Sequence, residues 1–353
     1  MIGFFFFLPF DDLFLSSPLK TNIIASFVSI APSFAIRTAL RINCAGVKAM
    51  ARQIPYTSRP LTPQFGIEAL NINLNDVDLT GTEFITHLKH DLIKHRCILF
   101  RNQHNLSGQR QVEISNALGT VESTFYKPPK SPHPDVFRVS NDEDEGCTQV
   151  GRSGWHVDGT FQMRPFMYQT MYFPSVNDGG DTLFIPLKEL YDSFSLEEKE
   201  YYNKLWMVTG RRQAPIHPLV YKHPFRNEET MIFHCGRPFV AGWYSDANDN
   251  DTNRAMIVNG VDLSKMIHPA VVQDKLTNKI ESKIDEFGLR MKWQKGDFMI
   301  IDNLGLAHYA SEGTQGSPEN VGLRILHRTT IVGGRETEPV KFDARTSFTL
   351  GNM

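Results

Sequence analysis

The sequence predicts an α+β protein built on an antiparallel sheet sandwich or barrel. Patterns typical of helices come early in the chain, whereas the last third is mostly β-rich. The 353 residues are 41% hydrophobic, which is enough to bury one large core. No Gly/Ser linker or internal repeat divides residues 50–353, so we expect them to form one domain.

The helices are predicted from spacing and capping residues. The first is expected to begin at Thr82 as its cap, and the residues of its buried face recur at helical spacing, namely Phe84, Leu88 and Leu92. A second helix is predicted over residues 107–118. A third begins at Ser195, because Ser195-Leu196-Glu197-Glu198 has the spacing of a capping box.

Four apolar or β-rich runs predict strands. They cover residues 97–100, 182–185, 298–301 and 321–331. The first is Cys97-Ile98-Leu99-Phe100, which suits a buried strand because all four residues are apolar. Gly296-Asp297 precedes the third run and Gly333-Gly334 follows the fourth, so turns are expected at both places.

Charge and cysteine content limit the class of partner and compartment. With 37 basic and 39 acidic residues the formal charge is −2, so we expect a small-molecule substrate and no nucleic-acid partner. A homo-oligomer is left open. The cysteines, Cys44, Cys97, Cys147 and Cys235, lie far apart without a Cys-x-x-Cys pair and do not indicate a disulfide framework or a zinc ribbon. A reducing compartment, the cytoplasm, is the expectation.

Residues 1–49 differ from the rest of the chain. Their apolar runs are interrupted by Asp11-Asp12 and Pro32 and fall short of the roughly 20 residues of a membrane helix, so no membrane span or membrane partner is predicted. Arg37, Arg41 and Lys48 lie in a stretch without acids. Two interpretations stay open: a dispensable extension before a functional start at Met50, or a presequence for a mitochondrion or another organelle.

The run from Gly154 to Phe161, Gly-Trp-His-Val-Asp-Gly-Thr-Phe, contains a histidine and an acid two positions apart. The flanking Trp155 and Phe161 favour β-structure, so we expect an extended backbone. An extended backbone places His156 and Asp158 on one face with Cα atoms about 6.6 Å apart. Both side chains could then bind one metal ion.

A second triplet of the same kind, His133-Pro134-Asp135, competes with the first. In a chain with 12 histidines and 39 acidic residues, about one His-x-acid triplet is expected by chance. His133 and Asp135 lie among several prolines, where no regular strand fixes the side-chain directions. We therefore interpret this triplet as part of a surface loop.

The third ligand is predicted in the segment from Asp302 to Ala310, which follows an apolar run and contains His308. Taken alone, His308 would be interpreted as a core histidine bonded to a backbone carbonyl. Two imidazoles and one carboxylate, however, form the set that binds iron(II) on one face and leaves the opposite face open. We predict that His156, Asp158 and His308 are the metal-binding, catalytic residues.

Two arginines strengthen this interpretation. Arg324 and Arg328 lie four residues apart on the predicted strand over 321–331, and therefore on the same face of it. Unpaired arginines on an inward face are costly to bury, so carboxylates or other anions are their natural partners. At about 13 Å between Cα atoms, the two side chains are expected to bind different anions. The alternative is that this face is exposed to solvent.

The chain resembles the TauD/TfdA family of iron(II)- and 2-oxoglutarate-dependent dioxygenases, from about Gly66 to Ile331. The residues that carry the resemblance are His95-Arg96-Cys97-Ile98-Leu99-Phe100-Arg101-Asn102-Gln103, Trp155 to Phe161, Gly179-Gly180-Asp181-Thr182-Leu183, His217-Pro218-Leu219-Val220, Asp302 to Ala310, and Leu326 to Ile331. Together, and in this order, these motifs are specific.

The resemblance implies a double-stranded β-helix, or jelly roll, flanked by helices. It places iron(II) on His156, Asp158 and His308, and it places the distal carboxylate of the co-substrate 2-oxoglutarate on Thr182 and Arg324. The implied reaction uses dioxygen and couples decarboxylation of 2-oxoglutarate to succinate and CO2 with hydroxylation of a small organic substrate. The alternatives are desaturation or cyclisation by the same iron-based oxidant, and a different metal-dependent enzyme on a cupin-like fold.

The substrate is less well defined by the resemblance. The histidine that helps to hold the sulfonate in taurine dioxygenase corresponds to a position near Thr124 here, so taurine is not the expected substrate. Arg328 matches the family position that can face the primary substrate. Together with Lys127 and Arg152 it favours an anionic substrate, whereas the alternative is that these basic side chains are merely solvated.

Overall fold

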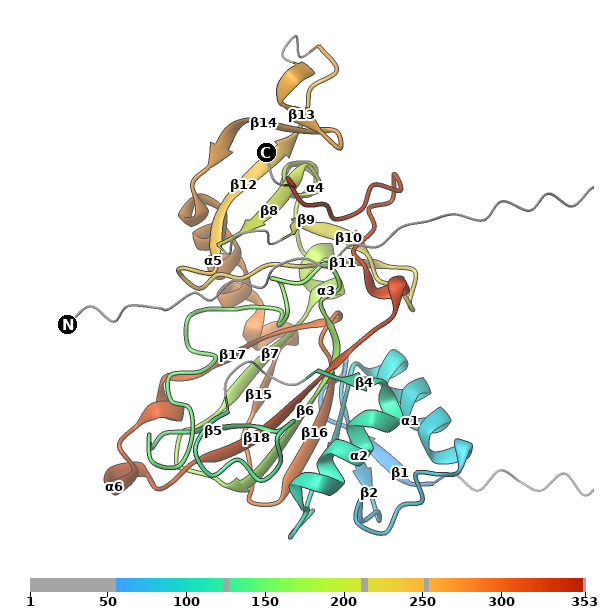
Figure 1. Cartoon of the computed structure of the whole chain (residues 1–353), viewed down its shortest axis with the longest axis vertical. Helices are drawn as coiled ribbons and strands as arrows, with labels where there is room; N and C mark the ends of the chain where they lie inside the picture. The colour runs from blue at the N-terminus through green and yellow to red at the C-terminus, as the bar shows by residue number, and fades with distance from the viewer. Residues whose placement is uncertain (1–54, 123–126, 211–214, 251–253, 352–353) are drawn as a thin grey trace, which may run out of the picture. The chain divides into compact units, whose positions relative to one another are not determined.

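The computed structural model describes residues 55–122, 127–210, 215–250 and 254–351 (Figure 1). The predicted N-terminal extension, residues 1–49, lies outside the described residues, and so does Thr124. In the ranges that are described, no helix is long and apolar enough to cross a membrane.

The largest sheet runs in the order β1-β2-β3-β16-β6-β18-β4, with β5 also paired to β18. Its strand pairs are antiparallel except for β2 and β3, which are parallel. The strands are β1 (Thr57–Pro60), β2 (Ile67–Leu70), β3 (Cys97–Phe100), β4 (Thr120–Val121), β5 (Phe137–Ser140), β6 (Phe166–Ser175), β16 (Asp297–Asp302) and β18 (Ile325–Val332).

Three smaller sheets accompany it, with the orders β15-β7-β17, β13-β14-β12-β8-β9 and β10-β11. Their strands are β7 (Thr182–Pro186), β8 (Leu205–Thr209), β9 (Ile216–Pro218), β10 (Val220–Lys222), β11 (Glu229–Met231), β12 (Val240–Asp246), β13 (Ile257–Val258), β14 (Val261–Ile267), β15 (Leu289–Met291) and β17 (Leu306–Ala310). The observed class is therefore α+β with mostly antiparallel sheets, as predicted.

Helices α1 and α2 lie beside the large sheet, and α5 lies beside the five-stranded sheet (Figure 1). The α-helices are α1 (Thr82–His95), α2 (Gly108–Leu118), α3 (Leu187–Asp192), α4 (Leu196–Asn203), α5 (Pro269–Phe287) and α6 (Pro318–Val321). Short 3-10 turns are η1 (Arg254–Met256), η2 (Glu312–Gln315) and η3 (Arg335–Thr337).

The central strands of the large sheet are buried on both faces, which explains their uninterrupted apolar sequences. In β16, Phe298 and Ile300 pack with the apolar face of α1, whereas Met299 and Ile301 pack on the other face with residues of the three-stranded sheet such as Phe184. Strand β3 alternates in the same way, and so does the end of β6, where Tyr172 packs on the first face and Met171 and Phe173 pack on the second. The face that meets the three-stranded sheet also carries the candidate site.

Most predicted elements are confirmed, with small shifts at their ends. The predicted strands over 97–100, 182–185 and 298–301 are β3, β7 and β16. Ser107 caps α2 by accepting a hydrogen bond from the Arg110 N–H at 3.0 Å, and the capping box of Ser195 and Glu198 is complete. The expectation that Thr82 caps α1 was wrong, because Gly81 is the N-cap and Thr82 is already helical. Helix α3 was not predicted.

The last predicted strand begins four residues later than expected. Residues 318–321 form α6, and Gly322 then turns the chain with a φ of +90° that suits glycine. Strand β18 starts only at Ile325. The prediction that Arg324 and Arg328 lie on one strand is therefore wrong, since Arg324 precedes β18 whereas Arg328 lies on it.

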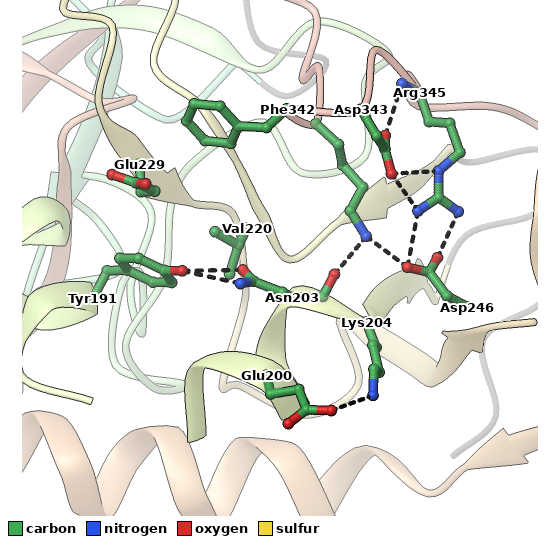
Figure 2. A pocket seen from close by; sticks show the side chains of 11 residues that line it. Tyr191, Glu200, Asn203, Lys204, Val220, Glu229, Asp246, Phe342, Asp343 and Arg345 are labelled. Carbon is green, nitrogen blue, oxygen red and sulfur yellow. Dashed lines mark hydrogen bonds and ion pairs between the residues drawn. The ribbon is translucent and has the colours of Figure 1, made fainter. Parts of the chain in front are cut away.

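The segment after β18 packs on the five-stranded sheet through Asp246, at the end of β12 (Figure 2). Arg345 donates from Nη1 and Nη2 to the two carboxylate oxygens at 2.7 and 2.9 Å. Trp206 donates to Oδ1 at 2.6 Å, and Lys341 donates to Oδ2 at 3.0 Å. We refer to Asp246, Arg345, Trp206 and Lys341 as the Asp246 cluster.

Candidate metal centre and carboxylate site

His156 lies where three segments of the chain meet. Its N–H donates to the carbonyl of His308 at 3.1 Å, and the N–H of His308 donates back at 3.0 Å. His156 also forms a bridge with His234. The backbone is extended here, as predicted, but it forms isolated bridges instead of a regular strand. The chain turns directly afterwards at residues 158–161, where Gly159 has a φ of +81°.

The side chains of His156, Asp158 and His308 converge. Each offers one ligand atom that lies within 4.8 Å of the other two. Nε2 of His156 is 3.7 Å from Oδ1 of Asp158, and Nε2 of His308 is 3.7 Å from Oδ2. The structure thus brings together the three predicted metal ligands, at separations that one ion with bonds of about 2.1 Å can bridge.

The protonation states also suit a metal. Nδ1 of His156 lies 2.7 Å from the carbonyl of Gly154, which only accepts, so Nδ1 carries the proton and Nε2 has a free lone pair. Burial lowers the pKa of His308 to about 3, so this imidazole is neutral at pH 7. Burial raises the pKa of Asp158, but Arg328 and the two imidazoles lower it more. The pKa therefore lies well below the usual range of an aspartate, and the carboxyl is ionised at pH 7.

Two buried amides hold Asp158, and sequence analysis identified neither. Asn303 accepts a hydrogen bond from the N–H of Asp158 at 3.0 Å and donates one to its carbonyl at 2.9 Å. Gln169, on β6, donates from Nε2 to Oδ2 of Asp158. Asn303 lies in the segment that the sequence singled out for His308. No motif marks Gln169, because its role depends on where β6 pairs in the sheet.

A further histidine, His234, lies beside the three candidate ligands. Its ring stacks on His156, with centroids 4.7 Å apart, and on Phe239, with centroids 4.1 Å apart. Burial lowers the pKa of His234 to about 2, so the ring is neutral. Gly236 donates its N–H to Nδ1 at 2.9 Å, which places the proton on Nε2. Sequence analysis missed His234 because no motif surrounds it.

Arg324 and Thr182 lie at a second site, linked by two aromatic rings. Arg324 is only 3% exposed, and its guanidinium has no acidic partner in the described part of the chain. It lies over the ring of Phe173, 5.0 Å from the centroid. Trp293 stacks on Phe173 at 4.0 Å and donates to Oγ1 of Thr182 at 2.9 Å. The Thr182 hydroxyl therefore keeps its own proton to donate to a ligand.

Arg328 has a different environment from Arg324. Its Nη1 donates to Oδ2 of Asp158 at 3.0 Å, and its guanidinium lies over the ring of Phe137, 5.1 Å from the centroid. Its Nε is buried and has no hydrogen-bond partner among the residues described. Burial lowers the pKa of Arg324 to about 10, so that side chain stays charged at pH 7. The two guanidinium groups thus have different surroundings, and the prediction that they bind different anions stays a prediction.

Lys127 and Arg152, the other predicted substrate residues that the structure describes, form no hydrogen bond or ion pair with the three candidate ligands in the described ranges. Lys127 is exposed. Arg152 is half-buried and donates to Gln149 in its own loop at 3.3 Å. The competing triplet lies in a turn in which the Asp135 N–H donates to Nδ1 of His133 at 3.0 Å, which confirms it as a loop.

The two sites together fit a metal ion and an exogenous dicarboxylate. Two imidazole nitrogens and one carboxylate oxygen would hold a metal ion from one side and leave its opposite side to other ligands. Among the residues that the structure describes, Arg324 has no counterion, and a buried charge of this kind is costly unless an anion binds there. A carboxylate could accept hydrogen bonds from both the guanidinium and the Thr182 hydroxyl.

Comparisons with known proteins agree with this geometry. The family model described as "Taurine catabolism dioxygenase TauD, TfdA family" matches residues 57–330. An alpha-ketoglutarate-dependent sulfate ester dioxygenase of Pseudomonas putida is 24% identical, over 82% of this chain and 93% of that protein. An alpha-ketoglutarate-dependent sulfonate dioxygenase of Saccharomyces cerevisiae is 25% identical, over 71% and 62%. A taurine dioxygenase from Burkholderia xenovorans shares the fold, with a TM-score of 0.63, 22% identity and coverage of 84% and 97%.

Proposed function

This chain belongs to the taurine catabolism dioxygenase TauD, TfdA family, and on that premise we propose that His156, Asp158 and His308 bind its catalytic iron. The enzyme is an iron(II)- and 2-oxoglutarate-dependent dioxygenase, and iron(II), 2-oxoglutarate and dioxygen are its cofactor and co-substrates. The observation that carries the assignment is the convergence of the three ligand atoms within 4.8 Å. The proton on Nδ1 of His156 supports it, because it leaves Nε2 free.

Thr182 and Arg324 are the proposed binding site for the distal carboxylate of 2-oxoglutarate. Arg324 supplies a buried charge that lacks a counterion in the described ranges, and Thr182 supplies a hydroxyl proton. The packed rings of Phe173 and Trp293 exclude water from this end, which strengthens the ion pair. Arg328 is not the better candidate, because Asp158 already compensates its charge.

We also propose that the large sheet and the three-stranded sheet form the jelly roll, or double-stranded β-helix, implied by the family. A shared apolar core between Met299 or Ile301 of the first sheet and Phe184 or Leu306 of the second supports this arrangement. His308 lies on β17 of the three-stranded sheet, and Gln169 and Arg328 lie on strands of the large sheet. The metal centre would then lie between the two sheets.

With iron(II) and 2-oxoglutarate bound, dioxygen supplies an oxidant that removes hydrogen from a substrate C–H bond while 2-oxoglutarate becomes succinate and CO2. The protein contributes position and environment. His156, Asp158 and His308 hold the ion on one side, and Arg324 with Thr182 fixes one end of the keto acid. Hydroxylation of a small anionic substrate is the proposed outcome.

Arg328 is a candidate contact for the substrate, because its buried Nε has no hydrogen-bond partner in the described structure while Nη1 is on Asp158, and this N–H could donate to an acceptor oxygen such as that of a sulfate or sulfonate. The relatives named for sulfate esters and sulfonates support the same substrate class. Lys127 and Arg152 remain candidates from the sequence. Taurine itself is not proposed, because Thr124 stands near the position of the family histidine that helps to hold its sulfonate.

Anaerobic titration with iron(II) and then 2-oxoglutarate tests the iron and co-substrate sites. The parent protein is expected to develop the weak visible charge-transfer band of the keto acid on iron, and His156→Ala is expected to lose it. His133→Ala is the matched control, because it removes the histidine of the competing triplet, and it should titrate like the parent. A parent without the band, or a His156→Ala variant with the same band, would refute the assignment.

Succinate release with candidate substrates tests the substrate class. Alkyl sulfate esters, sulfonates and carboxylates are expected to turn over better than uncharged compounds of the same carbon skeleton. Higher turnover of the uncharged compounds would rule out an anionic substrate. The mass of the product distinguishes hydroxylation, which adds an oxygen atom, from desaturation or cyclisation, which removes two hydrogens.

A further inference from the structure

Gln169 is a polar residue on the inward face of a central strand. Strand β6 lies between β16 and β18, and Gln169 pairs with Ile301 on one side and Thr330 on the other. Its side chain is fully buried, on the same face of β6 as Met171 and Phe173. Burying an amide in such a row is costly unless it is hydrogen-bonded, so its partner is informative.

The orientation of the Gln169 amide follows from its neighbour Asn303. Nδ2 of Asn303 donates to the carbonyls of Asp158 and Phe166 at 2.9 and 2.7 Å, so Oδ1 must be on its other side. That Oδ1 lies 3.3 Å from Nε2 of Gln169, which also contacts Oδ2 of Asp158. An oxygen at the Nε2 position would face two other oxygens, so only the nitrogen can occupy it.

We propose that Gln169 is a positioning residue that selects which oxygen of Asp158 binds the metal. Gln169 and Arg328 both donate to Oδ2 and use its two lone pairs. Each oxygen lies 3.7 Å from one imidazole nitrogen, Oδ1 from Nε2 of His156 and Oδ2 from Nε2 of His308, so distance does not distinguish them. Only Oδ1 accepts no hydrogen bond from the described residues, and its lone pairs are the ones left for a metal. The inference rests on the proposed function of Asp158 as an iron ligand.

Binding through Oδ1 alone has a consequence for the open face of the ion. A carboxylate that binds through one oxygen takes one coordination position, whereas a carboxylate that binds through both takes two. Two imidazoles and one carboxylate oxygen would leave the opposite side of a bound iron(II) ion free for the keto acid and dioxygen. Gln169 therefore preserves the positions that the reaction needs.

Gln169→Leu removes the donor at nearly the same side-chain size and is the principal test. Anaerobic titration with Co(II), followed by its visible d–d absorption, gives both the metal Kd and the coordination number. We expect the Kd to rise about 10-fold or more, as for other residues that orient metal ligands. We also expect the band intensity to fall, because weaker d–d bands accompany a higher coordination number.

Thr170→Val is the matched control on the neighbouring position of β6. Thr170 faces the opposite side and hydrogen-bonds with Gln111 and Thr329 at 2.9 and 2.6 Å. This variant should lower Tm and leave the Co(II) Kd and spectrum unchanged. An equal rise in Kd for both variants would mean general loosening of β6 and would overturn the inference.

The remaining outcomes separate this inference from the proposed function. If the parent binds no metal, the proposed iron site fails. If the parent binds Co(II) and Gln169→Leu binds it with the same Kd and spectrum, only the role of Gln169 fails. Should Gln169→Leu not fold, Gln169→Met, which also lacks a donor at this length, is expected to give the same change.

Discussion

Asp158 and Asp246 are both held by an arginine that lies over an aromatic ring, yet they use their hydrogen-bonding capacity differently. Asp246 accepts four hydrogen bonds, two on each oxygen. Asp158 accepts two on Oδ2, whereas Oδ1 accepts none from the residues described. A carboxylate saturated by its own chain can only hold that chain together. A carboxylate with one free oxygen can also bind a ligand.

The arginines of the two regions differ in the same way. Arg345 contacts two acids, Asp246 and Asp343, with donor distances of 2.6 to 2.9 Å. Arg324 is more deeply buried and has no acid beside it in the described part of the chain. Its charge is compensated only if a ligand supplies an anion. Both regions contain the same residue types. What distinguishes a binding site from a structural cluster is whether the charged side chains already have partners within the chain.

Replacing each aspartate with asparagine tests most directly whether Asp158 and Asp246 have different roles. Asp158→Asn removes the proposed anionic metal ligand and the ionic partner of Arg328, so we expect kcat/KM to fall by about 10⁴-fold and Tm to fall as well. Asp246→Asn removes the partner of two cations at a half-buried site. We expect it to lower the free energy of unfolding by about 2 kcal/mol and to leave the metal Kd unchanged. Coupled succinate release and urea unfolding measure the two effects. An exchange of the two outcomes would contradict the distinction.

The arginines allow a second test of the same distinction. Arg324→Leu removes a cation that has no acidic partner within the described ranges, so we expect no loss of stability but a rise in the 2-oxoglutarate Kd of roughly 30-fold, about 2 kcal/mol. Arg345→Leu is the control: it should lower the free energy of unfolding by about 1 kcal/mol and leave the 2-oxoglutarate Kd as in the parent. The anaerobic 2-oxoglutarate titration measures both constants. A loss of stability in Arg324→Leu would show that the chain itself compensates this charge.

The sequence could indicate residues that lie in motifs, and it could not indicate residues that depend on strand pairing. His156, Asp158 and His308 could be predicted as a group because their residue types are typical of a metal site, and the structure brings their ligand atoms within 4.8 Å of one another. Thr182 and Arg324 followed from the family resemblance, although Arg324 precedes β18 because Gly322 turns the chain first. Gln169 and His234 were not identifiable, since only the pairing of β6 and the bridge from His156 to His234 bring them to the centre.

Variants of His234 test whether His156 is held in place by the stacked ring of His234 or by the polar atoms of that ring. In the Asp246 cluster the Trp206 ring lies under Lys341 and Arg345, whereas here the His234 ring stacks on His156. His234→Ala removes the stack, which is worth about 1 kcal/mol, so we expect the metal Kd to rise roughly fivefold. His234→Phe keeps a ring and should restore most of the affinity. Equal losses in the two variants would instead assign the effect to the polar atoms of His234.

The pH dependence of stability in the Asp246 cluster is the smallest effect that we expect. It tests whether the charge of Asp246 stabilises the cluster. Burial raises the pKa of Asp246, but hydrogen bonds from Arg345, Trp206 and Lys341 lower it more, so the pKa in the folded protein is below its usual value. Stability contributed by the ionised form is therefore fully present above the unfolded-state pKa of about 4, and it is lost as the pH falls through the folded-state pKa. Asp246→Asn cannot titrate at this position.

The difference in unfolding free energy between the parent and Asp246→Asn should therefore be constant from about pH 7 to 5 and should shrink below about pH 4. Urea unfolding at several pH values measures it. A difference that stays the same at pH 3 would mean that the arrangement of hydrogen bonds, and not the charge of Asp246, stabilises the cluster. In that case Asp246 and Asp158 would differ only in their hydrogen bonds, because both oxygens of Asp246 accept hydrogen bonds whereas Oδ1 of Asp158 accepts none from the described residues.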